Sequence, residues 1–426
     1  MTHFGFVAPP FPSHMRALQA VARVLVERGH RVTFFHQADA ASLLQDPRIA
    51  FRAVGRASHP RGALAGVLQR AARPGGPLGL RRVIADVAAA TDMLCRALPD
   101  AFARAGIEAV VSDQMEAAGG LVAEALDLPW ISVACALPVD REPGVPLPVM
   151  PWRFADSDQA RHLYAASSRV YDYMMAPHAR VIAHHAAVFG LRPRSALHEC
   201  LSPYAQVSQT VAELEFPRRQ LPPNFHHVGP LRDRAPDPAL TLPLAPDRPV
   251  VFASLGTLQG QRLSIFRRIA RACRQRDLQL VIAHCGGLTP AQVASLAVPG
   301  VVQVVESVPQ RAMLARADAV VSHAGLNTVL DACVAGTPIL ALPIAFDQPG
   351  VAARVIHAGI GLGASARLAT AGQLRARLTR LLDESAFALR ARSLGGSVAA
   401  AGGAERAADI IESVAGTAQP VLASAA

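Results

Sequence analysis

A strand–turn–helix–strand pattern between residues 318 and 348 constrains the fold of this chain more than any other feature. An apolar segment at 319–321 runs into Ser-His-Ala-Gly, and a helical pattern follows over 326–334. A Gly-Thr-Pro turn at 336–338 ends that helix before a second apolar segment. Strand, helix and strand in this order predict a parallel βαβ unit. Open sheets of such units bind ligands beyond the carboxyl ends of their strands, where this stretch has its polar residues.

The turn before the helix predicts an anion site. A helix that begins with small residues presents free backbone N–H groups and the positive end of its dipole. Asp331, one turn further along, is suited to accept hydrogen bonds from a ribose, although a solvated helix carboxylate is an equal alternative. Asp347 and Gln348 close the second strand, where we expect a hydroxyl-rich group. The residues expected to hold the phosphate are His323, Gly325, Asn327 and Thr328.

The composition favours two aliphatic α/β cores. The chain has 426 residues, too many for one ordinary core. Hydrophobic residues make up 51% and aromatic residues 5%, which suits parallel sheets buried on both faces. The six cysteines lie far apart without a C-x-x-C pair, and this favours reduced core cysteines. We find no signal peptide, no apolar run of about 18 residues and no carboxylate cluster of metal-site type, so we expect a metal-independent cytoplasmic protein.

The positive charge is spread along the chain. The net charge is +10 and most of it comes from arginine, without a nucleic-acid-binding signature, so we expect no nucleic-acid partner. One run between Arg52 and Arg82 has no acidic residue and is broken by Gly and Pro. Such a segment can lie peripherally on an anionic membrane, but an ordinary mobile surface loop is the favoured interpretation.

The same alternating pattern occurs twice, which predicts two Rossmann-like domains. Strands are expected at 3–8, 31–35, 108–112 and 130–134, and again at 250–254, 278–283 and 301–305. A helical segment at 152–190 interrupts the pattern and is interpreted as an insertion. The prolines are dense from 217 to 249, which indicates a linker. We therefore predict an acceptor-side domain at 1–216, a linker at 217–249, a second domain at 250–418 whose last helix can pack back on the first, and a frayed tail at 419–426.

Both domains should present strand ends to the cleft between them. In the second domain these include the segment 307–310 and a loop after the first strand, with Ser254, Gly256 and Thr257. In the first domain His14 follows the first strand and Asp113 follows a neighbouring one. Asp113 can bond one ring nitrogen of His14 and leave the other to accept a proton. We expect the positive helix end to lower the pKa of His14 and keep it neutral.

These motifs resemble the UDP-glycosyltransferases, the GT-B enzymes of family 1. HAGLNTVLDACVAGTPILALPIAFDQ resembles the family's donor-binding signature, and FASLGT and HHVGPL match its second-domain loop and the segment before its linker. The resemblance implies a GT-B fold of two doubly wound domains and an inverting transfer that uses a UDP-sugar as co-substrate, without a cofactor. His14 falls at the position of the catalytic base and Asp113 at that of its partner. The implied donor-binding positions are Ser254, Gly256, Thr257, Ser307, Val308, Gln310, His323, Gly325, Asn327, Thr328, Asp331, Asp347 and Gln348.

Three departures and several longer segments refine the resemblance. Ser307 replaces a Trp that stacks on uracil in plant members, and Val351 replaces a common Asn after the Asp-Gln pair. Asp331 stands where the family usually has a Glu that bonds the ribose. ACALPVDREPGVPLPVMPW, FASLGTLQGQRL, AHCGGLTPAQ and FDQPGVAARV are similar to members that transfer glucose from UDP-glucose to a carotenoid diol. The alternatives are a transferase for a macrolide, flavonoid or other lipophilic acceptor and a GT-B UDP-sugar epimerase. A non-catalytic lipid-binding relative would not need His14 and Asp113.

Overall fold

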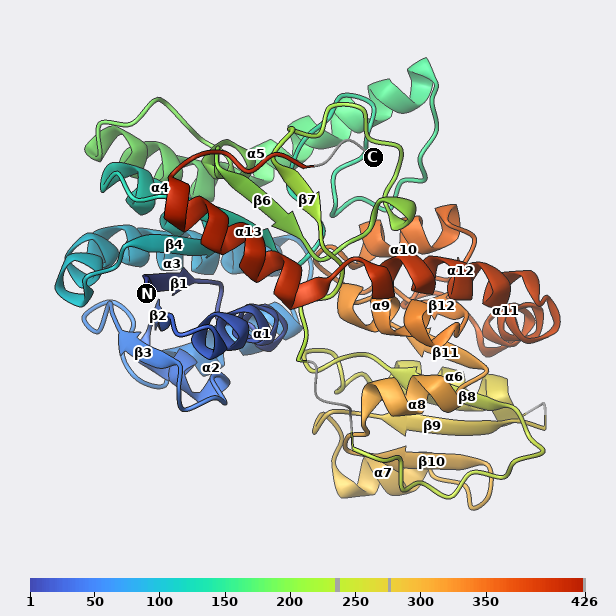
Figure 1. Cartoon of the computed structure of the whole chain (residues 1–426). Coiled ribbons are helices and arrows are strands. Elements are labelled where there is room, and N and C mark those ends of the chain that lie inside the picture. The colour runs from blue at the N-terminus through green and yellow to red at the C-terminus, as the bar shows by residue number, and fades with distance from the viewer. Residues whose placement is uncertain (234–237, 275–276, 424–426) are drawn as a thin grey trace.

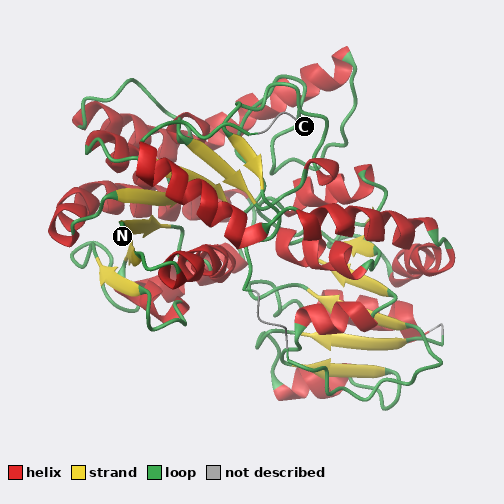
Figure 2. Ribbon diagram, viewed as in Figure 1, coloured by secondary structure: helices red, strands yellow, loops and turns green. Residues whose placement is uncertain are grey.

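A computed structural model describes residues 1–233, 238–274 and 277–423. It consists of two α/β domains, each a parallel sheet with helices on both faces (Figures 1 and 2). Parts of the expected linker (234–237) and of the expected tail (424–426) lie outside the described residues. Among the described residues, no helix combines the length and apolar character needed to cross a membrane.

The first domain contains a seven-stranded sheet in the order β3-β2-β1-β4-β5-β6-β7. Its strands are β1 (His3–Val7), β2 (Arg31–His36), β3 (Ala50–Ala53), β4 (Ala109–Asp113), β5 (Trp130–Ala134), β6 (Ala205–Ser208) and β7 (Phe225–His227). Its helices are α1 (Pro12–Glu27), α2 (Ala63–Ala72), α3 (Pro77–Ala105), α4 (Ala117–Ala125) and α5 (Asp158–Val188). Short 3-10 helices η1 (Ala38–Leu43), η2 (Leu197–Cys200) and η3 (Ala212–Leu214) complete it.

The second domain contains a six-stranded sheet in the order β10-β9-β8-β11-β12-β13. Its strands are β8 (Val250–Ser254), β9 (Gln279–Ala283), β10 (Val302–Val305), β11 (Ala319–Ser322), β12 (Ile339–Ala341) and β13 (Gly361–Gly363). Its helices are α6 (Leu263–Arg274), α7 (Pro290–Leu296), α8 (Gln310–Arg316), α9 (Leu326–Ala335), α10 (Gln348–His357), α11 (Ala371–Asp383) and α12 (Ala386–Ala400). The last helix, α13 (Gly403–Thr417), runs back to the first domain (Figure 1).

Aliphatic side chains on both faces of each sheet form the cores. All residues of β1, β4, β5, β8 and β9 are buried, so these strands read as continuous apolar runs rather than alternating ones. In the first domain α1 and α13 cover one face, and α3, α4 and α5 cover the other. In the second domain α8, α9, α10 and α12 cover one face, and α6, α7 and α11 cover the other.

Four expectations about segments need correction. The expected linker contributes β7, which pairs with β6 at the edge of the first sheet. The run 52–82, considered as a loop, instead contains α2 and the start of α3. The segment 152–190 is only partly an insertion, because Ile182 and Ala186 of α5 lie in the core, while the other end of α5 projects beyond the sheet (Figure 1). The tail is not frayed up to residue 423, since the Val421 and Ala423 N–H groups donate to the carbonyls of Tyr204 and Pro223.

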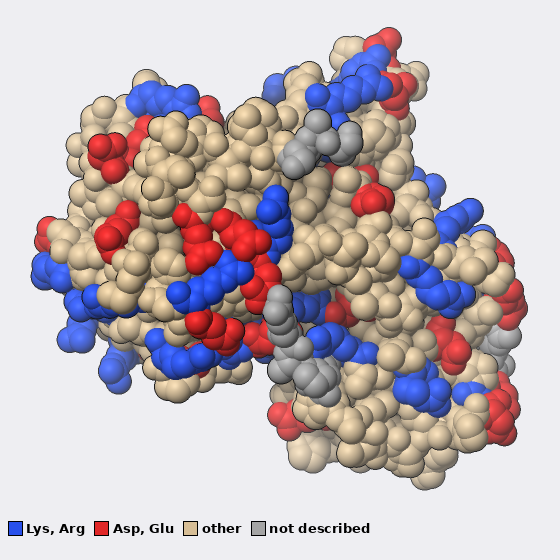
Figure 3. Space-filling view, viewed as in Figure 1, with Lys and Arg blue, Asp and Glu red and all other residues tan. Residues whose placement is uncertain are grey.

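Helix α13 is fixed to α1 by charge as well as by packing. Arg28, just beyond α1, forms ion pairs with Glu405, Asp409 and Glu412 of α13. Figure 3 shows acidic and basic side chains gathered where these two helices cross. Because the end of the chain is attached to the first domain, the two domains are connected by two crossings of the chain rather than by the proline-rich segment alone.

Candidate active site

His14 and Asp113 meet at the carboxyl edge of the first sheet. Strands β1 and β4 pair side by side, so the loop after β1 and the last residue of β4 adjoin. His14 lies in the first turn of α1, and its Nδ1 lies 2.7 Å from Asp113 Oδ2. The other carboxylate oxygen, Oδ1, accepts the Met115 N–H at 2.8 Å. The Asp113 side chain is fully buried while that of His14 is 14% exposed, so one ring edge of His14 remains accessible.

The pKa of His14 shifts in the opposite direction to the sequence expectation. Burial lowers this pKa. The charge of Asp113, the hydrogen bond to Asp113 and the charge of Asp347 together raise it by more than burial lowers it, so the net pKa lies above the usual value. The expectation that the helix end lowers this pKa is therefore wrong. A carboxylate in direct contact stabilises the imidazolium more than a helix end destabilises it.

Cys135 joins the pair, and the sequence analysis missed it. Its Sγ, a ring nitrogen of His14 and an Asp113 oxygen lie within 4.8 Å of one another, the spacing of a possible metal site. Burial and the nearby Asp113 raise the pKa of this thiol well above its usual value, so it remains a neutral S–H beside the carboxylate. The signal was available, because Cys135 directly follows β5, the strand that pairs with β4.

Asp347 of the second domain lies near His14 of the first, close enough for its charge to raise the pKa of that ring. Its Oδ2 accepts the Leu137 N–H of the first domain at 3.2 Å, and burial raises the pKa of its carboxyl group. The rings of Phe11 and Phe346, each next to this region, lie 6.1 Å apart between the domains. The structure therefore brings together the expected base and the expected sugar-binding residue, which come from different domains.

His323 lies in a cradle of glycine backbone at the edge of the second sheet. A Cβ added to Gly256 or Gly325 would lie 2.7 or 2.5 Å from its ring. Gly256 also has φ +72, a conformation in which a side chain is strained. Burial lowers the pKa of His323 to about 4, despite a bond to the Ser254 backbone that acts in the opposite direction. This imidazole is therefore neutral near pH 7, and its one N–H group is the donor in the bond to the Ser254 backbone.

The N-terminus of α9 is shaped for an anion. Gly325 is its cap residue, and no side chain caps the first turn. The preceding residue, Ala324, is buried and has φ +63, and the Ser322 hydroxyl accepts its N–H at 3.1 Å. Non-glycine residues seldom adopt this conformation, and those that do cluster at ligand sites. Ala324 sets the direction in which the chain enters α9, and its residue type gave no hint of this.

A hydrogen-bonded chain of side chains continues along α9. Thr328 donates to Gln310 Oε1 at 3.3 Å, and Gln310 Nε2 donates to Asp331 Oδ2 at 2.6 Å. Arg232, which follows β7, forms an ion pair with Asp331 Oδ1. The sequence analysis named the first three residues but missed Arg232, because it lies in the segment interpreted as a linker.

The other residues expected to bind the sugar donor differ from one another in burial and contacts. Ser254 is buried and its hydroxyl accepts the Gly256 N–H at 3.3 Å. Thr257 and Ser307 are exposed, and Val308 packs against the core. Gln348 Oε1 accepts the N–H groups of Ile344 and Ala345, both at 2.9 Å, so its amide oxygen holds the turn while its NH2 group remains to donate.

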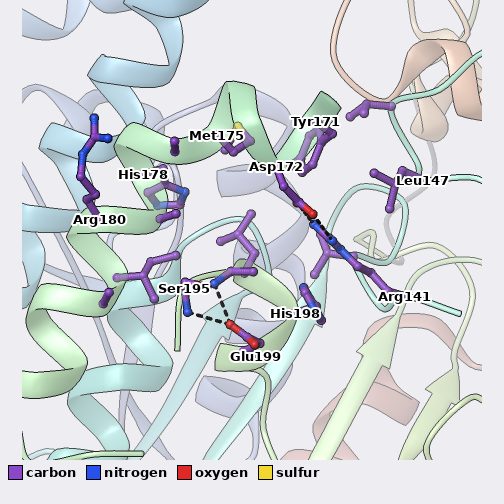
Figure 4. A pocket seen from close by; sticks show the side chains of 18 of the residues that line it. Arg141, Leu147, Tyr171, Asp172, Met175, His178, Arg180, Ser195, His198 and Glu199 are labelled. Carbon is purple, nitrogen blue, oxygen red and sulfur yellow. Dashed lines mark hydrogen bonds and ion pairs between the residues drawn. The ribbon is translucent and has the colours of Figure 1, made fainter. Parts of the chain in front are cut away.

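A cavity of about 610 Å³ lies in the first domain. The segment 139–149, helix α5 and the segment 195–199 form its walls, with Leu147, Met175 and His178 among the lining residues (Figure 4). Arg141 and Asp172 point toward one another at one side and form an ion pair. The wall residue Val139 is only two residues from Leu137, whose N–H contacts Asp347, so the segment that borders the cavity also contacts the second domain.

Comparisons with known proteins agree with this geometry. A profile of the UDP-glucoronosyl and UDP-glucosyl transferase family matches residues 87–394. The chain is 51% identical to a zeaxanthin glucosyltransferase from Pantoea ananas, covering 99% of this chain and 98% of that protein. It is 47% identical to a zeaxanthin glucosyltransferase from Pseudescherichia vulneris, with 97% and 98% covered. The crystal structure of a glycosyltransferase of kitacinnamycin superposes with a TM-score of 0.74 at 22% identity, over 97% of this chain and 98% of that one.

Proposed function

The chain belongs to the UDP-glucoronosyl and UDP-glucosyl transferase family, and we propose that it transfers glucose from UDP-glucose to the hydroxyl groups of zeaxanthin. Near full-length identities of 51% and 47% to two zeaxanthin glucosyltransferases support this acceptor. They also make a macrolide or flavonoid acceptor the weaker alternative. An epimerase is disfavoured because the matching family consists of transferases.

The observation that carries the proposal is the pairing of His14 with Asp113, near Asp347 of the second domain. With Nδ1 bonded to Asp113, the Nε2 atom of His14 accepts the proton of an acceptor hydroxyl. The hydroxyl oxygen then attacks C1 of the glucose, and the bond from C1 to the phosphate oxygen breaks. A single displacement of this kind inverts the anomeric centre, so an α-linked donor yields a β-glucoside.

The second domain stabilises the leaving group in this mechanism. The N–H groups at the start of α9, beside the His323 ring, suit the charge that develops on the diphosphate of UDP. Asp347 and the NH2 group of Gln348 bind hydroxyl groups of the glucose. The residues proposed to bind the donor therefore need no metal ion, and we expect full activity in the presence of EDTA.

The cavity beside α5 is the proposed entrance for the lipophilic acceptor. Its volume of about 610 Å³ lies within the usual range for small-molecule sites. It holds an end ring of the acceptor rather than the whole of a long carotenoid, whose polyene chain must remain outside. Helix α5, which forms one wall of the cavity, would thereby contribute to the choice of acceptor.

Incubation with radiolabelled UDP-glucose and a panel of acceptors tests the proposed function. We expect labelled mono- and diglucosides of zeaxanthin with β-configured anomeric centres by NMR. Label in a flavonoid or macrolide but none in zeaxanthin would refute the acceptor, and an α-glucoside would refute the single displacement.

Contact with a membrane is a further part of this proposal, since zeaxanthin dissolves in lipid. The seven arginines at positions 52, 56, 61, 70, 73, 81 and 82 are all exposed. We expect sedimentation with anionic liposomes to decrease when these arginines are replaced by glutamine. Replacement of Arg316 and Arg390, which are exposed on the second domain, is the control and should have little effect. Equal sedimentation of all variants would remove this segment from the membrane contact.

A further inference from the structure

Arg232 connects the segment between the domains to the donor-binding helix. It forms an ion pair with Asp331 Oδ1, and its Nη2 donates to the Asn327 carbonyl at 2.6 Å. Asn327 and Asp331 are four residues apart on α9, so they lie on the same face of the helix. The side chains of Arg232 and Asp331 are 21% and 6% exposed, so this contact is largely shielded from water.

Both oxygens of Asp331 are held in place. Arg232 bonds Oδ1, and Gln310 Nε2 donates to Oδ2 at 2.6 Å. Two such contacts fix the plane of the carboxylate, which has about four lone-pair sites in all. The sites that remain can accept only from a direction set by these two partners. A guanidinium is suited to this task, because its planar fork bonds two acceptors at once and remains charged.

The backbone beside Arg232 is itself anchored. The next residue, Asp233, forms an ion pair with Arg23 of α1, and α1 also carries His14 in its first turn. Asp233 therefore binds the first domain, and Arg232 binds the second. The contact between Asp233 and α1 anchors the backbone that carries Arg232 and keeps its side chain against α9.

We propose that Arg232 is a positioning residue for the nucleotide donor and directs the free lone pairs of Asp331 toward the ribose hydroxyl groups. The proposal rests on the proposed function, in which α9 binds a nucleoside diphosphate. It also explains how Asp331, one methylene shorter than glutamate, holds a ribose: the side chain reaches less far but is fixed in one orientation. The ligand selected is a ribonucleoside diphosphate in preference to its 2′-deoxy form.

The test measures binding of UDP and of 2′-deoxy-UDP to the full chain by calorimetry. Wild type should prefer UDP. Arg232→Met should weaken UDP binding about tenfold, the scale of one charge-assisted hydrogen bond, and should weaken 2′-deoxy-UDP binding much less. Arg232→Lys keeps the charge without the fork and should give an intermediate preference. In steady-state kinetics the weakening should appear as a raised KM for UDP-glucose, larger for Arg232→Met than for Arg232→Lys.

Arg248→Met is the matched control. Arg248 lies in the same proline-rich segment with a similarly exposed side chain, 23%, but it donates to the carbonyls of Gly300 and Leu278. These carbonyls precede β10 and β9, at the edge of the sheet opposite α9. The control should bind UDP like wild type.

Asp331→Asn, alone and combined with Arg232→Met, completes the test. The double variant should bind UDP no more weakly than Asp331→Asn alone, since Arg232 acts through Asp331. Equal weakening of UDP and 2′-deoxy-UDP by Arg232→Met, or additive losses in the double variant, would overturn the proposal and leave Arg232 as a connection between the domains. Failure of the proposed function is distinguishable, because it would appear as absent transfer to zeaxanthin with these binding preferences intact.

Discussion

His14 in the first domain and His323 in the second both lie just beyond the carboxyl end of a strand, and burial acts on both imidazoles in the same direction. Asp113 reverses the effect at His14, whose pKa lies above the usual value. At His323 glycine backbone surrounds the ring, and the pKa falls to about 4. The partner of the ring, rather than its place at a helix start, therefore decides whether the pKa of each imidazole rises or falls.

The contrast between the two histidines is tested most strongly by His14→Ala. Loss of the base should reduce turnover by about 10²–10⁴-fold. UDP binding should stay close to that of wild type, because the proposed donor residues lie in the second domain. Steady-state kinetics and calorimetry with UDP measure the two effects. A comparable loss of UDP binding would indicate that His14 supports the structure rather than the reaction.

Asp113→Asn removes the partner and leaves the ring. We expect a reduction in kcat/KM of about 10–100-fold, the scale of a hydrogen bond to a charged group, with a changed pH profile. In wild type, activity declines as the pH falls through the raised pKa of His14, because the base becomes protonated. Without Asp113 burial dominates and lowers this pKa, so the acidic limb should move to lower pH. An unmoved limb would mean that another group titrates.

Asp347→Ala tests the residue that faces His14 from the second domain. Loss of its hydrogen bonds to the sugar should raise the KM for UDP-glucose about tenfold or alter the preference among UDP-sugars. Asp277→Ala is the control, because Asp277 is exposed at the opposite edge of the same sheet. Unchanged donor kinetics in Asp347→Ala would exclude this residue from the sugar site.

Gly256→Ala should have the smallest effect on turnover. It should disturb the His323 ring and leave His14 and Asp113 unchanged. The new Cβ would lie 2.7 Å from the His323 ring, and the left-handed conformation costs an alanine about 1 kcal/mol. We expect a several-fold higher KM for the donor and an unchanged acidic limb. Gly190→Ala has a similar φ of +68 and open space around its Cβ, so it imposes the strain without the clash. Equal donor KM values in these two variants would show that the ring does not contribute.

The pattern of apolar segments predicted most of the strands and helices, because these depend on neighbouring residues. Strands at 130–134 and 250–254 agree with β5 and β8 residue for residue. The short strand Phe225–His227 escaped notice, since three residues among prolines carry too little signal and their pairing with β6 depends on distant residues. The Gly and Pro residues before α3 obscured the start of that helix in the sequence.

The residues of the candidate site show the same difference between local patterns, which the sequence reveals, and distant contacts, which it does not. His14, Asp113, His323 and Asp347 were found because each follows a strand, and strand ends of a parallel sheet share one edge. Cys135 and Arg232 were not found, since a buried cysteine looks like a core residue and an arginine between prolines looks like a linker. Their roles depend on contacts with Asp113 and Asp331, which lie far away in sequence.

The sequence alone determined that the chain folds into two α/β domains and that residues 318–348 form a βαβ unit, because periodicity, glycine turns and helix starts are local properties. The tertiary structure alone decided which charges meet. It set the direction of the His14 pKa, brought Asp347 close to His14 and bound Arg232 to Asp331. The reason is physical: electrostatic energies depend on distance and burial, and only the packed chain fixes both.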